Sequence, residues 1–181
     1  MAPEARLEST DHGTVPQGDG WFVLNARDSS WRYAEGRSAV CDFEGDSDFT
    51  QLGVNITVLD PGVPMAMYHW EADQEDFLVL AGEALLIVEG EERPLKQWDF
   101  VHCPAQTNHV LVGAGSGLCA VLAVGARVES TGDDWGAYTV DEVAQRHGAG
   151  VAHETKDELE AYGHLTGREL TGYRDGWLPS E

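Results

Sequence analysis

The sequence contains very little lysine and little positive charge of any kind. Lys96 and Lys156 are its lysines, and lysine and arginine together number 11 against 32 aspartates and glutamates, a formal net charge of −21. Such an excess of negative charge repels a phosphate backbone or an anionic membrane over most of the surface. We therefore expect neither a nucleic acid nor a membrane among the partners. The same composition suits a high-salt cytosol and a GC-rich genome equally.

Long apolar runs are also lacking. The residues up to Thr14 are polar and acidic, which argues against a signal peptide, and the most apolar window, 118–124, has the length of a buried strand rather than a membrane span. Three cysteines, Cys41, Cys103 and Cys119, cannot all pair with one another and have no C-x-x-C spacing. These absences favour a reduced, cytoplasmic protein.

The length of 181 residues allows one well-buried core but is short for two domains. Residues 1–20 are mostly polar, and we expect a loose N-terminal arm there. Residues 21–127 contain short apolar segments separated by turn residues, which is typical of a β-barrel or sandwich. Residues 128–181 are expected to form a helical extension and a docking tail.

The strand pattern is clearest in three segments. In 52–58, large apolar residues alternate with smaller or polar ones, and the turn residues 60–62 (Asp-Pro-Gly) end the segment. The runs FLVL at 77–80 and ALLIV at 84–88 are continuously apolar. Continuous runs indicate strands that are covered on both faces, as when two sheets pack together.

The C-terminal part carries helix signals instead. The segments 139–142 and 155–158 read as capping boxes, each opened by a threonine and closed by a glutamate. Each predicts a short helix that ends near a glycine, Gly148 and Gly163 respectively. The last residues, around Trp177, are too apolar for a free tail and are expected to dock on the barrel or across a dimer.

Two segments, 61–90 and 98–115, carry recognisable spacing. In the first, Glu75 is followed by six residues and then Gly82; in the second, His109 follows Pro104 by five positions. These segments resemble the two motifs of the cupin superfamily, in which H-x-H is followed by a glutamate and a glycine, and P-x-G-x-x-H comes later. Trp98 and Gln106 stand where the second motif usually has glycine.

The resemblance covers about residues 50–126. It implies a mainly β fold, a double-stranded β-helix (jelly-roll) cupin barrel, followed in this chain by two short C-terminal helices. It also implies a pocket of metal-binding type inside the barrel and, by the habit of the family, a homodimer. The reaction does not follow from it, because many chemistries share this barrel.

The H-x-H of the first motif is absent, since the residues there are Tyr68-His69-Trp70-Glu71. In one register the two histidine positions fall on Tyr68 and Trp70, which abolishes a metal site; in the other they fall on His69 and Glu71. Alternate residues of a strand share a face in both registers. We favour the second, because it directs His69 and Glu71 inward and lets the two aromatic residues pack outside.

In that register the resemblance implies a metal site made of His69, Glu71, Glu75 and His109. Two imidazoles and a carboxylate suit a divalent transition metal, Fe, Mn, Ni or Zn. As a fourth ligand, Glu71 adds negative charge and reduces the Lewis acidity of the ion; alternatively, it acts beside the ion as a catalytic general base. The sequence leaves both roles open.

The expected function is that of a metal-binding cupin acting on a small molecule inside the barrel, with oxygenase-like chemistry favoured over isomerase or decarboxylase chemistry. The alternative is a non-catalytic small-ligand or metal-binding module, which Glu71 in place of a histidine keeps open, so the sequence does not establish an enzyme. Among nearby residues, His102 is expected to pack beside the site, and Cys103 to be a buried small hydrophobe.

Overall fold

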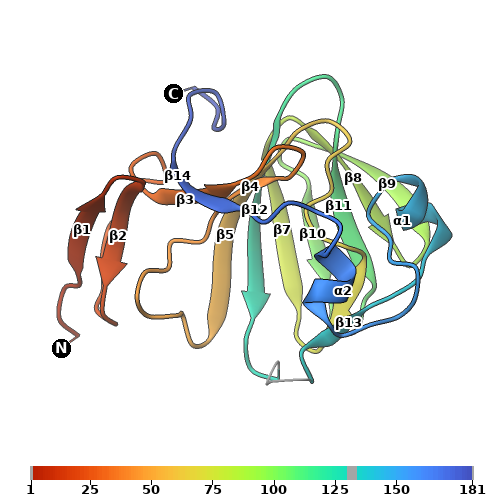
Figure 1. The fold of residues 1–181 in the computed structure, drawn as a ribbon, viewed down its shortest axis with the longest axis horizontal. Coiled ribbons are helices and arrows are strands. Elements are labelled where there is room, and N and C mark those ends of the chain that lie inside the picture. The colour runs from red at the N-terminus through yellow and green to blue at the C-terminus, as the bar shows by residue number, and fades with distance from the viewer. Residues whose placement is uncertain (1, 130–133, 181) are drawn as a thin grey trace.

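Short strands joined by turns make up most of the computed structural model, which describes residues 2–129 and 134–180 (Figure 1). The strands are β1 (Arg6–Thr10), β2 (Gly13–Gln17), β3 (Ser30–Tyr33), β4 (Ala39–Cys41), β5 (Leu52–Leu59), β6 (His69–Glu71), β7 (Glu75–Ala81), β8 (Glu83–Val88), β9 (Glu91–Lys96), β10 (Phe100–Cys103), β11 (His109–Ala114), β12 (Cys119–Ala126), β13 (Gly136–Tyr138) and β14 (Glu169–Gly172). The helices are α1 (Glu142–Arg146) and α2 (Glu158–Tyr162).

Two antiparallel sheets form the barrel. One has the order β10-β7-β12-β5-β4-β3-β14, and the other the order β13-β6-β11-β8-β9. Leu59, Val79, Leu86 and Leu111 come from both sheets and belong to one buried cluster between them. The expected mainly β, jelly-roll architecture with two short C-terminal helices is confirmed.

The alternation in β5 divides its residues between two environments. Ile56 and Val58 pack on the outer face of the seven-stranded sheet, in a cluster around Trp31. The residues of opposite parity, Asn55 and Thr57, line a cavity inside the barrel. The polar set of this strand therefore faces the interior, because that interior holds a cavity as well as an apolar core.

The apolar C-terminal segment docks on the barrel of its own chain. This is one of the two expected arrangements; the other was docking across a dimer. Trp177 is 9% exposed, and its ring lies 5.0 Å from that of the fully buried Trp31. Strand β14 pairs with β3 and extends the seven-stranded sheet. Burial of these two rings against the sheet stabilises the C-terminal segment through apolar area and aromatic contact.

The N-terminal residues are more ordered than the expected loose arm. Strands β1 and β2 form a separate antiparallel hairpin, which lies beside the barrel near the N-terminus (Figure 1). Its first strand is exposed throughout. Polar residues obscured this hairpin in the sequence because both of its strands bury little apolar surface.

Both expected helices are present, but the residues that cap them differ from the expected threonines. The Asp141 carboxylate accepts a hydrogen bond from the amide of Ala144, and Asp157 caps α2 in the same way. The Thr139 hydroxyl instead donates to the side chain of Asn108, 2.7 Å away. Helix α1 packs by Ala144 on the outer face of β8 and β11.

Candidate metal centre

Both sheets contribute side chains to one point inside the barrel. His69 opens β6 and His109 opens β11, and the two residues lie directly opposite each other in the five-stranded sheet. Glu75 opens β7 in the facing sheet, where it pairs with Gly125 of β12. One nitrogen from each histidine and one oxygen from Glu75 all lie within 4.8 Å of one another. We call these three residues the triad.

The two imidazoles are held in a defined orientation. Nδ1 of His69 lies 2.7 Å from the carbonyl oxygen of Met67, and Nδ1 of His109 lies 2.9 Å from that of Thr107. A carbonyl only accepts, so each Nδ1 carries the proton and donates it. In the neutral imidazole this leaves the Nε2 lone pair free for a metal, an arrangement usual for metal-binding histidines.

The Nε2 atoms converge on the Glu75 carboxylate. Nε2 of His109 lies 3.0 Å from Oε2 of Glu75, and Nε2 of His69 lies 3.6 Å from the same oxygen. Among the described residues, neither His109 Nε2 nor Glu75 Oε2 makes a hydrogen bond of normal geometry, although both atoms are buried and lie within ion-pair distance of each other. Buried polar atoms without partners are uncommon and costly. A cation bound between them would satisfy both.

Without a cation, the side chains of the triad shift one another's pKa values. Burial by itself lowers the pKa of His69, but the Glu71 and Glu75 carboxylates outweigh it and raise that pKa to about 9. Burial also opposes protonation of His109, whose pKa is raised to about 10 by the Cys103 and Glu75 side chains. Burial opposes ionisation of Glu75, yet the two histidines lower its pKa to about 2. The carboxylate of Glu75 is therefore charged at neutral pH.

Glu71 lies at the border of the triad. Its Oε1 is 3.6 Å from Nε2 of His69, and its side chain is 27% exposed, against 16% for Glu75. The favoured register is confirmed, since His69 and Glu71 face the interior while Tyr68 packs on the outer face with Ile87. Glu71 thus lies where it can reach a bound ion or a substrate. Its two expected roles, as a fourth ligand or as a general base, stay proposals.

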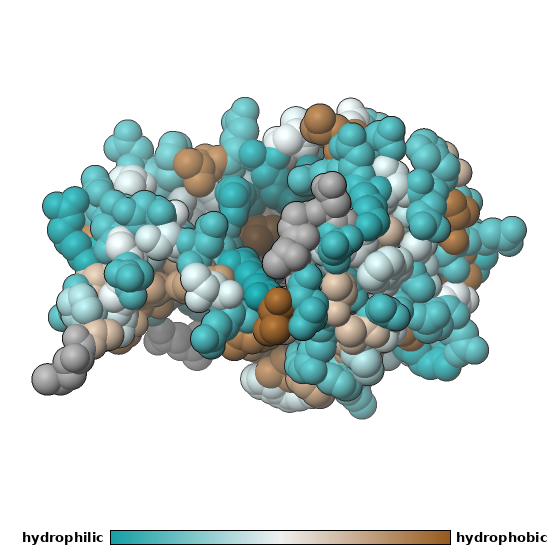
Figure 2. Space-filling model, turned by 90° about the horizontal axis from the view of Figure 1, so that it is seen from below, coloured by the Kyte–Doolittle hydropathy of each residue, from teal (hydrophilic) through white to brown (hydrophobic). Residues whose placement is uncertain are grey.

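Two cavities meet at these carboxylates. One, of about 260 Å³, reaches into the barrel past the triad, and the other, of about 350 Å³, lies toward Gly53, Gly125 and Arg127. Both are lined by Glu71, Glu75, Asn55 and Trp135. Figure 2 views the end of the molecule where β12 ends and shows a hollow near its centre among mainly hydrophilic side chains.

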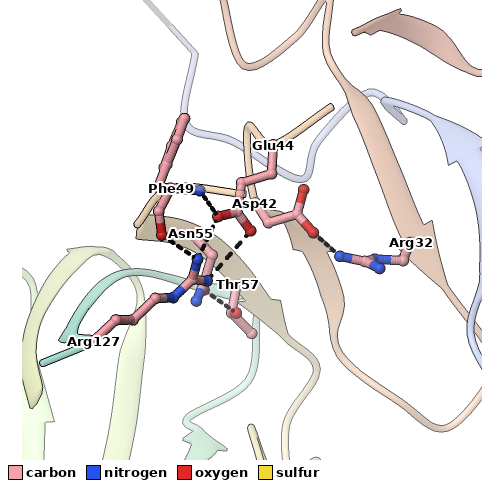
Figure 3. A network of polar contacts seen from close by, with 7 residues as sticks. All are labelled: Arg32, Asp42, Glu44, Phe49, Asn55, Thr57 and Arg127. Atoms are coloured by element: carbon pink, nitrogen blue, oxygen red, sulfur yellow. Dashed lines mark hydrogen bonds and ion pairs between the residues drawn. The ribbon is translucent and has the colours of Figure 1, made fainter. Parts of the chain in front are cut away.

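A polar network holds the chain at the end of the barrel where β12 ends (Figure 3). The Arg127 guanidinium donates to Glu44, with Nη1 2.6 Å from Oε1, and to the carbonyl of Phe49 at 2.7 Å. The amide of Phe49 also donates to Glu44. Burial raises the pKa of Glu44, but the Arg127 contact dominates and lowers it. The network ties the segment before β5 to the end of β12.

Comparison with known proteins agrees with the geometry. The family described as the cupin domain matches residues 55–125, which include all three triad residues. Residues 55–125, less than half of the chain, are therefore similar to the cupin domain. No curated protein matches the chain.

Two solved structures show a similar fold over part of this chain. One, named a predicted oxalate decarboxylase from Thermotoga maritima, is 17% identical, with 59% of this chain and 100% of that chain covered and a TM-score of 0.52. The polyketide cyclase RemF from Streptomyces resistomycificus is 13% identical, with 60% and 80% covered and a TM-score of 0.51. At these identities the likeness establishes the fold and does not identify the reaction.

The positions at which the cupin motifs have glycine take positive φ values in this chain. Gly82 has φ +77°, as its turn requires. Trp98 and Gln106, which replace motif glycines, have φ values of 73° and 67°. A side chain in this region is strained, and the fold here bears that strain at both positions. The amide of Gln106 donates to the carbonyl of Glu71 at 2.8 Å, so the strained turn also anchors β6.

Of the two residues singled out beside the motifs, Cys103 lies as expected and His102 does not. Cys103 is buried, 2% exposed, as expected. His102 is different, since its side chain is 50% exposed and pairs with Asp76 on the barrel's outside. Its place on β10 alternates with the inward residues Val101 and Cys103, so strand parity directs it outward.

Several cavity-lining residues carried no motif in the sequence. They are Asn55, Thr57, Trp135, Tyr138, Tyr162 and Arg168. The alternation of polar residues in β5 was a usable signal for the first two. The other four come from the extension after residue 127, which packs against the barrel through contacts distant in sequence, and no local pattern indicates them.

Proposed function

We propose that this protein binds a divalent transition metal through His69, Glu75 and His109 and acts on a small organic molecule inside the barrel. The observation that carries the proposal is the orientation of the triad. Both Nδ1 atoms donate to carbonyls, and the buried Nε2 of His109 and Oε2 of Glu75 converge without a hydrogen bond of normal geometry. Two imidazoles and one carboxylate suit Fe, Mn, Ni or Zn.

The bound ion would supply Lewis acidity at open coordination positions. The residues of the chain would do the rest. Phe77 and Trp135 line the cavity beside the triad and exclude water, which strengthens electrostatic interactions there. Glu71, exposed toward the cavity, would accept a proton from the substrate as a general base or add a ligand to the ion.

Oxygenase-like chemistry fits this set best, because two histidines and one carboxylate are the ligands of many non-haem Fe(II) oxygenases. Isomerase or decarboxylase chemistry uses the same donors. The second candidate is a non-catalytic metal- or ligand-binding module. It is favoured by Glu71, whose negative charge beside Glu75 would reduce the Lewis acidity of a bound ion.

The test is a titration of chelator-treated protein with Co(II), whose visible absorption reports ligation. The wild-type protein should bind about one equivalent, and the variant His109→Ala should bind none, because it loses an imidazole ligand. His102→Ala is the matched control, since His102 lies on β10, which pairs with the strand of Glu75, but faces outward; this variant should bind like wild type. Equal binding by wild type and His109→Ala would refute the proposed site.

A further test separates enzyme from module. Protein reloaded with Fe(II) should consume oxygen in the presence of a bound small molecule, and Glu71→Gln should retain the metal but lose that activity. Oxygen consumption unaffected by Glu71→Gln would remove the proposed role as base. Full metal and ligand binding without any chemical change of the ligand would support the module.

A further inference from the structure

One arginine on the wall of the triad cavity has no carboxylate partner. Arg168 directly precedes β14 and lines the same cavity as His69, Glu75 and His109. Its Nε donates to the carbonyl of Ser38 at 2.9 Å, and its Nη2 donates to the Ser38 hydroxyl at 2.6 Å. Across residues 2–129 and 134–180, no ion pair involves it.

The surroundings of Arg168 disfavour its charge. Burial lowers the pKa of Arg168 to about 10, with a further contribution from the nearby positive charge of Arg37. Arg37 itself stacks on Tyr162, 5.1 Å from the ring centroid, and forms no ion pair within the described ranges. Glu158 is near enough to attract Arg168 but makes no ion pair with it. A paired anion stabilises a partly buried guanidinium, so a negatively charged ligand would fit beside Arg168.

The free donors of Arg168 indicate the shape of that anion. A guanidinium has five N–H donors, and Ser38 uses those on the edge formed by Nε and Nη2. The edge formed by the two terminal nitrogens is left with its N–H groups. Two parallel N–H groups match the two oxygens of a carboxylate, which gives a bidentate pair.

The rest of the cavity indicates the body of the ligand. Rings of Phe77, Trp135, Tyr138 and Tyr162 line the cavity that Arg168 and the triad share. The Tyr138 ring lies 6.0 Å from that of His69 and 5.5 Å from that of Tyr162, so aromatic faces connect the two polar ends. The volume, about 260 Å³, is below the range usual for drug-sized ligands, about 300–1,000 Å³.

We propose that the cavity takes a small carboxylic acid with a flat, apolar body, bound through its carboxylate by Arg168 and presenting its other end to the triad. This inference rests on the proposed function, because it names the substrate class of the same cavity. The net charge of −21 repels anions in general, so Arg168 supplies local attraction in a molecule whose field opposes it.

The experiment measures binding by calorimetry, with 2-hydroxybenzoate and its neutral analogue 2-hydroxybenzamide as probes, to chelator-treated and to Mn(II)-loaded protein. The wild type should bind the acid at least about tenfold more tightly than the amide, as expected for hydrogen bonds to a charged group. Arg168→Gln should abolish that preference and retain Mn(II). Arg168→Lys keeps the positive charge but loses the two parallel N–H donors, and it should keep part of the preference for the acid. Arg6→Gln, an exposed arginine, is the control and should match wild type.

The outcomes separate this inference from the metal proposal. A preference for the acid that depends on Arg168 without Mn(II) supports the carboxylate site even if the triad binds no metal. No binding of either probe by wild type, equal binding of acid and amide, or an acid preference that survives in Arg168→Gln would overturn it. Inorganic phosphate that competes as strongly as the acid, in an Arg168-dependent manner, would overturn the assignment to a carboxylic acid.

Discussion

Within the triad, backbone carbonyls determine which nitrogen of each histidine is available. The carbonyls of Met67 and Thr107 each accept from an Nδ1, and both residues lie two positions before the histidine that they orient. The sequence alone predicted His69, Glu75 and His109 from spacing and resemblance. It could not show the carbonyl contacts, which depend on the local path of the chain before β6 and β11.

The position of Glu71 leads to a prediction about metal affinity. Glu75→Gln should abolish Mn(II) binding, because it removes the buried carboxylate of the triad. Glu71→Gln should weaken binding by less, since Glu71 lies at the border of the site and is more exposed. Glu71→His should keep or tighten binding of Ni(II) or Zn(II), which imidazole suits. Tyr68→Phe, on the outer face, is the control. A larger loss from Glu71→Gln than from Glu75→Gln would contradict this account.

Protons should compete with the metal at the two histidines. Burial opposes protonation, but neighbouring acidic groups raise the pKa of His69 to about 9 and of His109 to about 10. In the metal-free protein, the resulting stabilisation is fully present below the unfolded pKa of about 6.5 and lost as the pH rises through about 9 to 10. The Glu75 pKa, lowered to about 2, leaves its carboxylate ionised throughout.

Metal binding must release these protons, so its apparent affinity should increase with pH. We therefore predict that the difference in Tm between Mn(II)-loaded and chelator-treated protein widens from pH 6 to pH 9. The measurement is thermal unfolding of both forms at several pH values and one ionic strength. A difference that stays constant or narrows would show that the histidines are not exchanging protons for metal.

Among the structural elements, the turn between β7 and β8 shows why the motif requires glycine. At Gly82, a Cβ atom would lie 2.2 Å from the carbonyl oxygen of Leu118, and φ is +77°. Gly62 has nearly the same φ, +78°, but a Cβ there would meet nothing within 4 Å. The two glycines therefore separate the cost of the backbone conformation from the cost of the steric clash.

Gly82→Ala should lower the free energy of unfolding by about 2–5 kcal/mol, the sum of left-handed strain and overpacking. Gly62→Ala, the matched control, should lower it by about 1–2 kcal/mol, from strain alone. Urea unfolding of both variants checks the difference. Equal losses would mean that the backbone near Leu118 shifts without cost.

The elements themselves were largely predictable. Apolar segments and turn residues indicated β5, β7 and β8, since their patterns are local. The helix caps were misplaced by two residues, because Thr139 and Asp141 both suit an N-cap and Thr139 finds another partner in Asn108. The hairpin before residue 20 was missed, because exposed strands lack an apolar face that would indicate them.

For the whole molecule, the homodimer stays a prediction. Trp177 packs within its own chain, so the C-terminal aromatics do not require a partner. Strand β10 is an edge of its sheet; Phe100, its first residue, is 64% exposed, and Trp98, just before the strand, is 67% exposed. Open edges and large exposed aromatics are usually covered. Light scattering should show a dimer at micromolar concentration and a monomer for Phe100→Asp; a wild-type monomer would contradict the prediction.

The exterior of the molecule is mainly hydrophilic on the face seen from below (Figure 2). Among the described residues, no helix is long and apolar enough to span a membrane. The cytoplasmic location expected from the reduced cysteines stays a prediction.

The central claim is that the triad holds a metal, and elemental analysis tests it most directly. Protein purified without chelator and without a nickel column should contain about one equivalent of Fe, Mn, Ni or Zn per chain. His109→Ala, prepared identically and shown to be folded, should contain almost none, while His102→Ala should match the wild type. A metal content near zero in wild type, or one that is unchanged in His109→Ala, would contradict the account.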